Sequence, residues 1–272
     1  AFPNLDYDIE RYLGPGEITL LTRDGCEVLK PAGPTLQICA FLWVYYGYPA
    51  SSYEGISVES VRYRCGAALA RNEVEEIDVV AGIPDSGTAH ALGYAIEACK
   101  PYKRPFVKYT PTWPRSFMPQ NQDFRDLVAR MKLIPVHDLI DQKRLLFCED
   151  SIVRGTQLTD IVQRVFGDGA KEVHMRPACP PLVYGCKYLN FSRSRSPLDL
   201  ATRKAIEELE PDATGLSKYT DPDSDAYAAM IEKIRSRLGL TTLRYQRLED
   251  LVTAIGLPKE KLCTYCWDGS EE

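Results

Sequence analysis

Apolar positions follow two different periods along the chain, and the changes of period predict a succession of strands and helices. The apolar runs at residues 17–21 and 78–84 have the length of strands. Small and apolar residues recur at helical spacing over residues 57–71 and 89–98. The run at 78–84 is apolar at successive positions, so we expect a buried parallel strand that ends in a loop.

The same order of strand, loop and helix is repeated further along the chain. Residues 144–148 form an apolar strand, and Leu158, Val162 and Val165 mark one face of the helix that follows. Residues 171–175 predict a further strand. Repeated units of this kind predict an α/β fold, an open and mostly parallel sheet flanked by helices, with its ligand at the carboxyl ends of the strands.

The remaining segments are less regular. Residues 207–225 are rich in Asp, Glu, Pro, Ser and Thr and predict an exposed insertion or linker. Helical segments are expected at residues 226–238 and 248–255. The aromatic run at residues 41–46 is typical of a core segment or a contact between subunits.

Composition and charge narrow the class of ligand. The chain has 272 residues, of which 44% are apolar, so a sizeable core is expected. Its net charge of −5 argues against a nucleic-acid backbone or a polybasic membrane anchor as partner, and favours a small molecule. The longest apolar stretches fall well short of the roughly 18 residues of a spanning helix. We therefore expect a soluble, cytoplasmic protein.

The cysteines suggest a second kind of chemistry. There are nine, an odd number in a chain too large to need disulfides, and the cytosol would keep them reduced. Cys263 and Cys266 form a CxxC pair, a spacing that serves metals and redox pairs alike. Five other cysteines lie in strand-like, helix-like or Pro-adjacent contexts, so we expect them to be buried apolar residues. They are Cys26, Cys65, Cys99, Cys148 and Cys179.

The most specific motif is the loop at residues 149–156. Two adjacent carboxylates end a strand, and a loop of Ser, Gly and Thr then opens a helix. The amides of such a loop and the helix N-terminus direct partial positive charge at a phosphate, and Gly155 allows close approach of the backbone. The carboxylates suit the neighbouring ribose hydroxyls and a positive charge that develops on the sugar ring. The alternative is a helix-capping turn, which needs only one acid.

The loop sequence Asp-Ser-Ile-Val-Arg-Gly-Thr resembles the phosphoribosyl pyrophosphate (PRPP) signature of type I phosphoribosyltransferases, in the form found in the amidophosphoribosyltransferases. The resemblance extends from about Gly14 to Gly269 and includes residues 82–86, 91–94, 130–133 and 169–174. It implies a type I phosphoribosyltransferase fold and a glycosyltransferase of purine biosynthesis. It also implies three segments: a stub at 1–36 like the end of a glutaminase domain, a phosphoribosyltransferase domain at 37–206, and an insertion with a C-terminal helical, cluster-binding segment at 207–272.

The resemblance assigns candidate site residues. Glu149, Asp150, Lys108 and Arg115 are the candidate catalytic residues, and Ser86, Glu149 and Asp150 would surround Mg²⁺. PRPP would be bound by Asp85, Ser86, Gly87, Glu149, Asp150, Ser151, Ile152, Val153, Arg154, Gly155 and Thr156.

Four cysteines fall at the positions that hold a [4Fe-4S] cluster in the iron-sulfur branch of the family. They are Cys39, Cys186, Cys263 and Cys266. Four thiolates also suit tetrahedral Zn²⁺, which stays open as an alternative. The expected role of the metal is structural: it would tie the C-terminal segment to the sheet domain.

Two departures from the family leave alternatives open. A glutaminase domain is missing from this sequence, so we expect free ammonia or a small amine as acceptor, with a separate glutaminase subunit or a processing step as further options. The catalytic loop is altered at residues 109–114, where two prolines occur. The alternatives are therefore a phosphoribosyltransferase with a different acceptor, or a PRPP-binding regulatory homologue or partner subunit without catalysis. A homo-oligomer is also expected.

Overall fold

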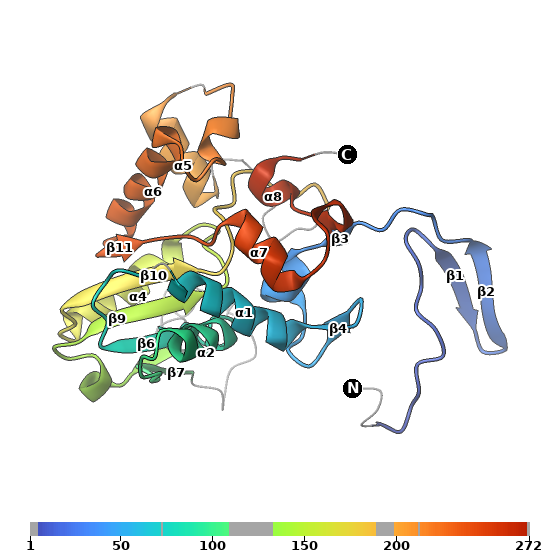
Figure 1. Cartoon of the computed structure of the whole chain (residues 1–272), viewed down its shortest axis with the longest axis horizontal. Helices are drawn as coiled ribbons and strands as arrows, with labels where there is room; N and C mark the ends of the chain where they lie inside the picture. Colours follow the sequence, from blue (N-terminus) through green and yellow to red (C-terminus); the bar gives the residue numbers. More distant parts are fainter. Residues whose placement is uncertain (1–4, 72, 109–132, 189–198, 212, 271–272) are drawn as a thin grey trace, which may run out of the picture. The chain divides into compact units, whose positions relative to one another are not determined.

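The structure, a computed structural model, describes residues 5–71, 73–108, 133–188, 199–211 and 213–270 (Figure 1). Contacts divide the chain into two compact units. The first comprises Ala1–Cys39 and Leu257–Cys263, and the second comprises Ala40–Gly256 and Thr264–Glu272. The domain boundaries inferred from the resemblance stay a prediction.

The first unit consists of small pairs of strands. Strands β1 (Ile18–Thr22) and β2 (Gly25–Lys30) form an antiparallel hairpin, and the short strands β3 (Ile38–Cys39) and β12 (Leu262–Cys263) pair in parallel. The strand expected at residues 17–21 is thus confirmed as β1. Every residue of β2 is exposed.

The second unit holds the main sheet and most of the helices. Its strands are β4 (Ser52–Tyr53), β5 (Ile56–Ser57), β6 (Val79–Gly82), β7 (Phe106–Lys108), β8 (Leu133–Pro135), β9 (Arg144–Glu149), β10 (Glu172–Pro177) and β11 (Thr242–Leu243). Its α-helices are α1 (Val58–Arg71), α2 (Thr88–Glu97), α4 (Thr156–Gly167), α5 (Ala201–Leu209), α6 (Asp225–Leu238), α7 (Leu248–Ile255) and α8 (Tyr265–Asp268).

The main sheet is parallel, with strand order β11-β10-β9-β6. Alternate residues of each strand face opposite sides, as the period of a strand requires. Leu145, Phe147 and Met175 belong to a core that also contains the apolar faces of α4 and α6, while α2 packs on β6 and β9 and carries α1 on its outer side. The predicted α/β fold, a parallel sheet flanked by helices, is confirmed (Figure 1).

Most of the helices and strands expected from periodicity are present within a few residues of their predicted ends. The exposed linker expected at residues 207–225 is wrong in part, because α5 continues to Leu209 and the ring of Tyr219 is only 3% exposed. The aromatic run forms a π-helix at Leu42–Tyr46, in which Trp43 is buried and Tyr45 is exposed.

Two of the cysteines expected to be buried are exposed. Cys65, Cys148 and Cys179 are buried as predicted, and burial raises the pKa of the Cys65 thiol to about 12. Cys26 is exposed because it lies in β2, which packs against no core, and Cys99 is exposed just beyond the end of α2. Within the described ranges, no helix combines the length and the apolar character that crossing a bilayer requires.

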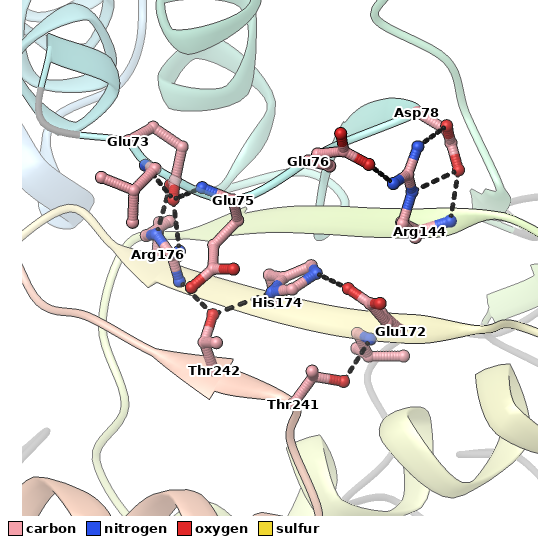
Figure 2. Close-up of polar contacts among 12 residues, drawn as sticks. Glu73, Glu75, Glu76, Asp78, Arg144, Glu172, His174, Arg176, Thr241 and Thr242 are labelled. Atoms are coloured by element: carbon pink, nitrogen blue, oxygen red, sulfur yellow. Dashed lines mark hydrogen bonds and ion pairs between the residues drawn. The ribbon is translucent and has the colours of Figure 1, made fainter.

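A buried ionic network joins the sheet to the helices on the α2 side. Arg176 of β10 donates to both carboxylate oxygens of Glu73, over 2.8 and 2.9 Å, and Tyr94 of α2 and Arg244 donate to the same carboxylate. Arg176 also donates to the hydroxyl of Thr242, which contacts Nδ1 of His174 (Figure 2). The guanidinium of Arg176 holds the pKa of Glu73 at about 2 in spite of partial burial, so this carboxylate stays ionised.

Helices α1 and α2 approach each other through glycines. A Cβ atom added at Gly93 would lie 2.0 Å from the carbonyl oxygen of Tyr63, and one at Gly66 would lie 1.9 Å from that of His90. Backbone atoms cannot yield as the end of a side chain can. Glycine at these two positions is therefore a packing requirement.

We expect Gly93→Ala to lower the free energy of unfolding by about 1–3 kcal/mol, since the added methyl group forces the two helices apart. The measurement is denaturant unfolding followed by circular dichroism. Gly167→Ala is the matched control: it lies at the end of α4 with no atom within 4 Å of the added Cβ. Equal effects of the two substitutions would contradict the packing role.

Candidate functional site

The candidate site lies where β6 and β9 end. The two strands are parallel neighbours in which Gly82 pairs with Cys148, so the segments that follow them leave the sheet at the same edge. After β6 comes the turn Pro84-Asp85-Ser86-Gly87, and after β9 come Glu149 and the loop to α4. Sequence reasoning brought these two segments together, and the structure does the same.

Two glycines let the first turn fold back onto β9. The amide of Ile83 donates to the carbonyl of Cys148 over 3.0 Å, and the amide of Gly87 donates to the carbonyl of Ile83. A Cβ atom at Gly87 would lie 2.2 Å from the carbonyl oxygen of Cys148, and one at Gly82 would lie 2.6 Å from the backbone of Gly87. Any side chain at these positions would push the turn away from the strand end.

The turn contributes polar side chains to the site. The hydroxyl of Ser86 donates to Glu149 over 2.8 Å, which joins the two strand ends directly. Lys108, the last residue of β7, forms an ion pair with Asp85, and both side chains are well exposed. Of the candidate loop cations, Lys108 is thus placed at the turn, whereas Arg115 lies outside the described residues.

The two acids differ in their surroundings from ordinary surface carboxylates. Asp150 is 6% exposed, and its amide donates to Oε1 of Glu149 over 3.0 Å. Ser151 donates to the Asp150 carboxylate. Burial raises the pKa of Glu149 well above its usual range, and the adjacent Asp150 raises it further. Burial likewise raises the pKa of Asp150, although hydrogen bonds from Ser151 and Ser86 oppose the shift.

The loop after the two acids leads to the N-terminus of α4, which no side chain caps. Gly155 is the N-cap of α4 and has φ of 78°, a left-handed conformation that glycine adopts without steric cost. Gly155 has no side chain that could accept from the first amides of α4, and its carbonyl accepts from the amide of Thr159 over 3.0 Å. The first amides of the helix therefore keep their positive partial charge for a ligand. Ile152 anchors the loop in the core, and the carbonyl of Val153 accepts from the amide of Ala201 at the start of α5.

Arg62 is a residue whose role sequence reasoning missed. Its side chain is buried on α1 and donates to the carbonyls of Trp43, Tyr45 and Gly47 over 2.9 to 3.0 Å. The positive charge of this guanidinium also acts on Asp150 and favours the ionised carboxylate. A lone arginine on a helix face of small and apolar residues was the signal in the sequence.

Two of the three histidines of the chain, His90 and His174, do not take part in the site. His90 is fully buried, with Nε2 3.2 Å from the carbonyl oxygen of Val44, and burial lowers its pKa to about 4. His174 is fully buried between Thr242 and Glu172, and burial lowers its pKa as well. Both are therefore packing residues that stay neutral near pH 7.

The four candidate metal-binding cysteines are divided between the two units. Cys39 and Cys263 are paired residues of β3 and β12. Cys266 belongs to the second unit with Cys186, and the amide of Tyr184, two residues before Cys186, donates to the carbonyl of Cys266 over 3.1 Å. In the described part of the chain, His, Cys, Asp and Glu side chains form no group of three or more that could hold a metal ion.

The sequence of the chain is similar to known amidophosphoribosyltransferases. The amidophosphoribosyltransferase of Mycobacterium bovis is 35% identical over 260 residues, which cover 95% of this chain and 45% of the relative. That of Methanocaldococcus jannaschii is 37% identical over 231 residues, covering 85% of this chain and 43% of the relative. The chain is homologous to about half of an amidophosphoribosyltransferase.

Solved structures lead to the same family. Glutamine PRPP amidotransferase from B. subtilis, solved with ADP and GMP, is 28% identical and has a TM-score of 0.73, over 95% of this chain and 52% of that one. No family model matches the chain. The chain spans about half the length of the relatives and structures it matches, so the homology concerns that half.

The raised carboxyl pKa values predict how stability changes with pH. Both acids are protonated in the folded and unfolded states at low pH, and as pH rises the unfolded chain releases these protons more readily than the folded one. Stability contributed by the protonated pair is therefore lost as pH rises through the folded pKa values. We expect Glu149→Gln to raise the free energy of unfolding more at pH 8 than at pH 5.

Denaturant unfolding at the two pH values, without divalent cations, is the measurement. Glu97→Gln is the control, since Glu97 is exposed at the end of α2 and lies outside the site. A Glu149→Gln effect that is the same at pH 5 and pH 8 would show that this carboxyl has an ordinary pKa.

Proposed function

We propose that the chain is a PRPP-dependent transferase of purine biosynthesis, which displaces pyrophosphate with ammonia or a small amine to give phosphoribosylamine. The observation that carries the proposal is the junction of Ser86 with Glu149 beside the glycine-capped N-terminus of α4. Relatives 35% identical over 95% of the chain bear the name amidophosphoribosyltransferase, which supports the same chemistry.

The 5-phosphate would lie on the loop between the acids and α4. Residues Ser151 to Thr156 offer backbone amides, the hydroxyls of Ser151 and Thr156, and the positive end of a helix of 12 residues. The pyrophosphate would lie at Asp85, Ser86 and Gly87, where Lys108 provides a positive charge. Arg115, the second candidate cation, lies in the altered loop outside the described residues.

The reaction exchanges one bond at C1 of the ribose. The nitrogen lone pair of ammonia forms the new C1–N bond, the C1–O bond breaks, and pyrophosphate departs with that electron pair while the nitrogen loses a proton to solvent. Positive charge develops on the ribosyl ring as the bond to oxygen lengthens. Glu149 and Asp150 are the proposed catalytic carboxylates because their negative charge would stabilise the ring most when its positive charge is greatest.

The donor set at the strand ends fits Mg²⁺. The ion prefers oxygen ligands and usually binds through one or two carboxylates and substrate phosphates. Ser86, Glu149 and Asp150 provide such oxygens, and burial together with mutual repulsion makes the ionised acids costly. A cation bound between the two carboxylates would stabilise their ionised forms. When bound, Mg²⁺ would neutralise pyrophosphate as a leaving group.

The first prediction of the proposal concerns pyrophosphate release from PRPP and Mg²⁺. We expect release that depends on ammonium at alkaline pH, and a loss of about 100-fold or more in Asp150→Asn, as for removal of a group that stabilises charge in a transition state. The measurement is a coupled pyrophosphate assay with ammonium present and absent.

Asp160→Asn is the matched control, since Asp160 is exposed on α4 and its carboxylate lies outside the loop. PRPP binding without ammonium-dependent release would refute the proposed reaction and favour a regulatory homologue. Release with another amine or a heterocycle alone would refute ammonia as the acceptor.

We also propose that Cys39, Cys186, Cys263 and Cys266 bind a [4Fe-4S] cluster, with Zn²⁺ as the alternative. The support is the family resemblance and the two local pairings, in which β3–β12 brings Cys39 beside Cys263 and backbone hydrogen bonds bring residues 183–184 to Cys266. A thiolate-bound cluster here would be structural, since transfer to an amine includes no redox step. A separate glutaminase subunit and a homo-oligomer stay predictions.

The cluster has a spectroscopic test that does not depend on activity. Protein purified without oxygen should be brown, absorb broadly near about 400 nm, and contain about four iron atoms per chain, and Cys263→Ser should lose most of both. Cys99→Ser is the control, since Cys99 is exposed and lies outside the proposed set. A colourless, zinc-loaded protein would refute the iron-sulfur assignment.

A further inference from the structure

A basic cavity lies at the edge of the main sheet opposite to the PRPP site. It has a volume of about 480 Å³, which is within the usual range for a small-molecule site. The residues of β6, β9 and β10 that line it stand at or beside the first positions of their strands, whereas the PRPP loop follows the last positions. The charged side chains that line it are Asp78, Lys103, Lys143, Arg144, Lys171 and Glu172.

Three lysines reach this cavity from different segments. Lys103 follows α2, and its amide donates to the carbonyl of Val80, which fixes the segment along β6. Lys143 and Lys171 directly precede β9 and β10, and the amide of Lys171 donates to the carbonyl of Lys143 over 2.9 Å. In the described ranges of the chain, none of these three ammonium groups forms an ion pair with a carboxylate.

The two carboxylates of the cavity are already engaged elsewhere. Arg144 donates to both oxygens of Asp78 over 2.9 and 3.2 Å and also pairs with Glu76, and this guanidinium holds the pKa of Asp78 at about 2 (Figure 2). Glu172 accepts from Nε2 of His174 over 2.9 Å, while Nδ1 of the same ring contacts Thr242 (Figure 2). Asp78 and Glu172 therefore have closer partners than the three lysines, although the positive charge of Lys143 also acts on Asp78.

The local charge is opposite to that of the whole chain. The six charged side chains that line the cavity have a net charge of +2, which falls to +1 when Glu76, the second partner of Arg144, is counted, while the chain carries −5. Uncompensated ammonium groups around one concave surface raise the local concentration of anions. Lysine binds phosphate groups as a compact point charge with three donors.

We propose that this cavity binds a small molecule that carries a phosphate or pyrophosphate group, with Lys103, Lys143 and Lys171 as its ligands. The site is separate from the PRPP site, since the two lie at opposite ends of the same strands. It does not depend on the proposed transferase activity.

The test is a titration of the whole chain with inorganic pyrophosphate, without Mg²⁺, followed by amide chemical shifts. We expect saturable shifts of the amides of residues 142–144 and 171–172, distinct from any at residues 151–156. In the double variant Lys143→Gln/Lys171→Gln, binding at this position should weaken about tenfold or more, as for loss of charged hydrogen bonds. Lys103→Gln is an independent variant with the same expected direction.

Lys204→Gln is the matched control, since Lys204 is exposed on α5 and does not line the cavity. Thermal unfolding followed by circular dichroism establishes that each variant is folded. Shifts that sodium chloride reproduces at equal ionic strength, or that persist in the double variant, would overturn the proposal. A stronger response to a hexaglutamate peptide than to pyrophosphate would overturn it in favour of an acidic protein segment.

Discussion

The contact between Gly87 and the carbonyl of Cys148 is the constraint from which the geometry of the candidate site follows. With a Cβ atom this approach would be 2.2 Å, so only glycine lets the turn after β6 lie against the end of β9. The approach brings Ser86 to Glu149 over 2.8 Å and sets Asp85 beside Lys108. Parallel pairing of Gly82 with Cys148 supplies the register on which all of this depends.

The ionic network on the α2 side of the sheet joins β10, the neighbour of β9, to α2. Glu73 receives four hydrogen bonds from Arg176, Tyr94 and Arg244, which belong to β10, α2 and the segment after β11. A buried carboxylate that lost these partners would be costly, so the network specifies one arrangement of strand and helix. Arg62 fixes α1 in a similar way, because its guanidinium donates hydrogen bonds to three carbonyls of the segment at residues 43–47.

Sequence reasoning succeeded where a short pattern determines the structure and failed where packing over long distances decides it. The apolar strand at residues 144–148 and the loop after it were predictable, because periodicity and glycine chemistry act locally. The roles of Glu73 and Arg176 were not, because their partners lie far apart in the sequence. Cys26 and Cys99 show a related limit: their local contexts suggested burial, but exposure depends on what packs over them. Arg115 and the altered loop at residues 109–114 lie outside the described residues.

The two ends of the main sheet use charge in opposite ways. At the carboxyl ends, Asp150 is buried beside the half-buried Glu149, and burial raises the pKa of both carboxyls in spite of the positive charge of Arg62 near Asp150. At the amino ends, three lysines surround a cavity whose acids are bonded to Arg144 and His174, so that positive charge is in excess. Buried carboxylates are costly to ionise, and lysines gathered around one concave surface attract anions. The acids therefore suit a cation and the lysines suit an anion, which is why we propose a ligand for each end of the sheet.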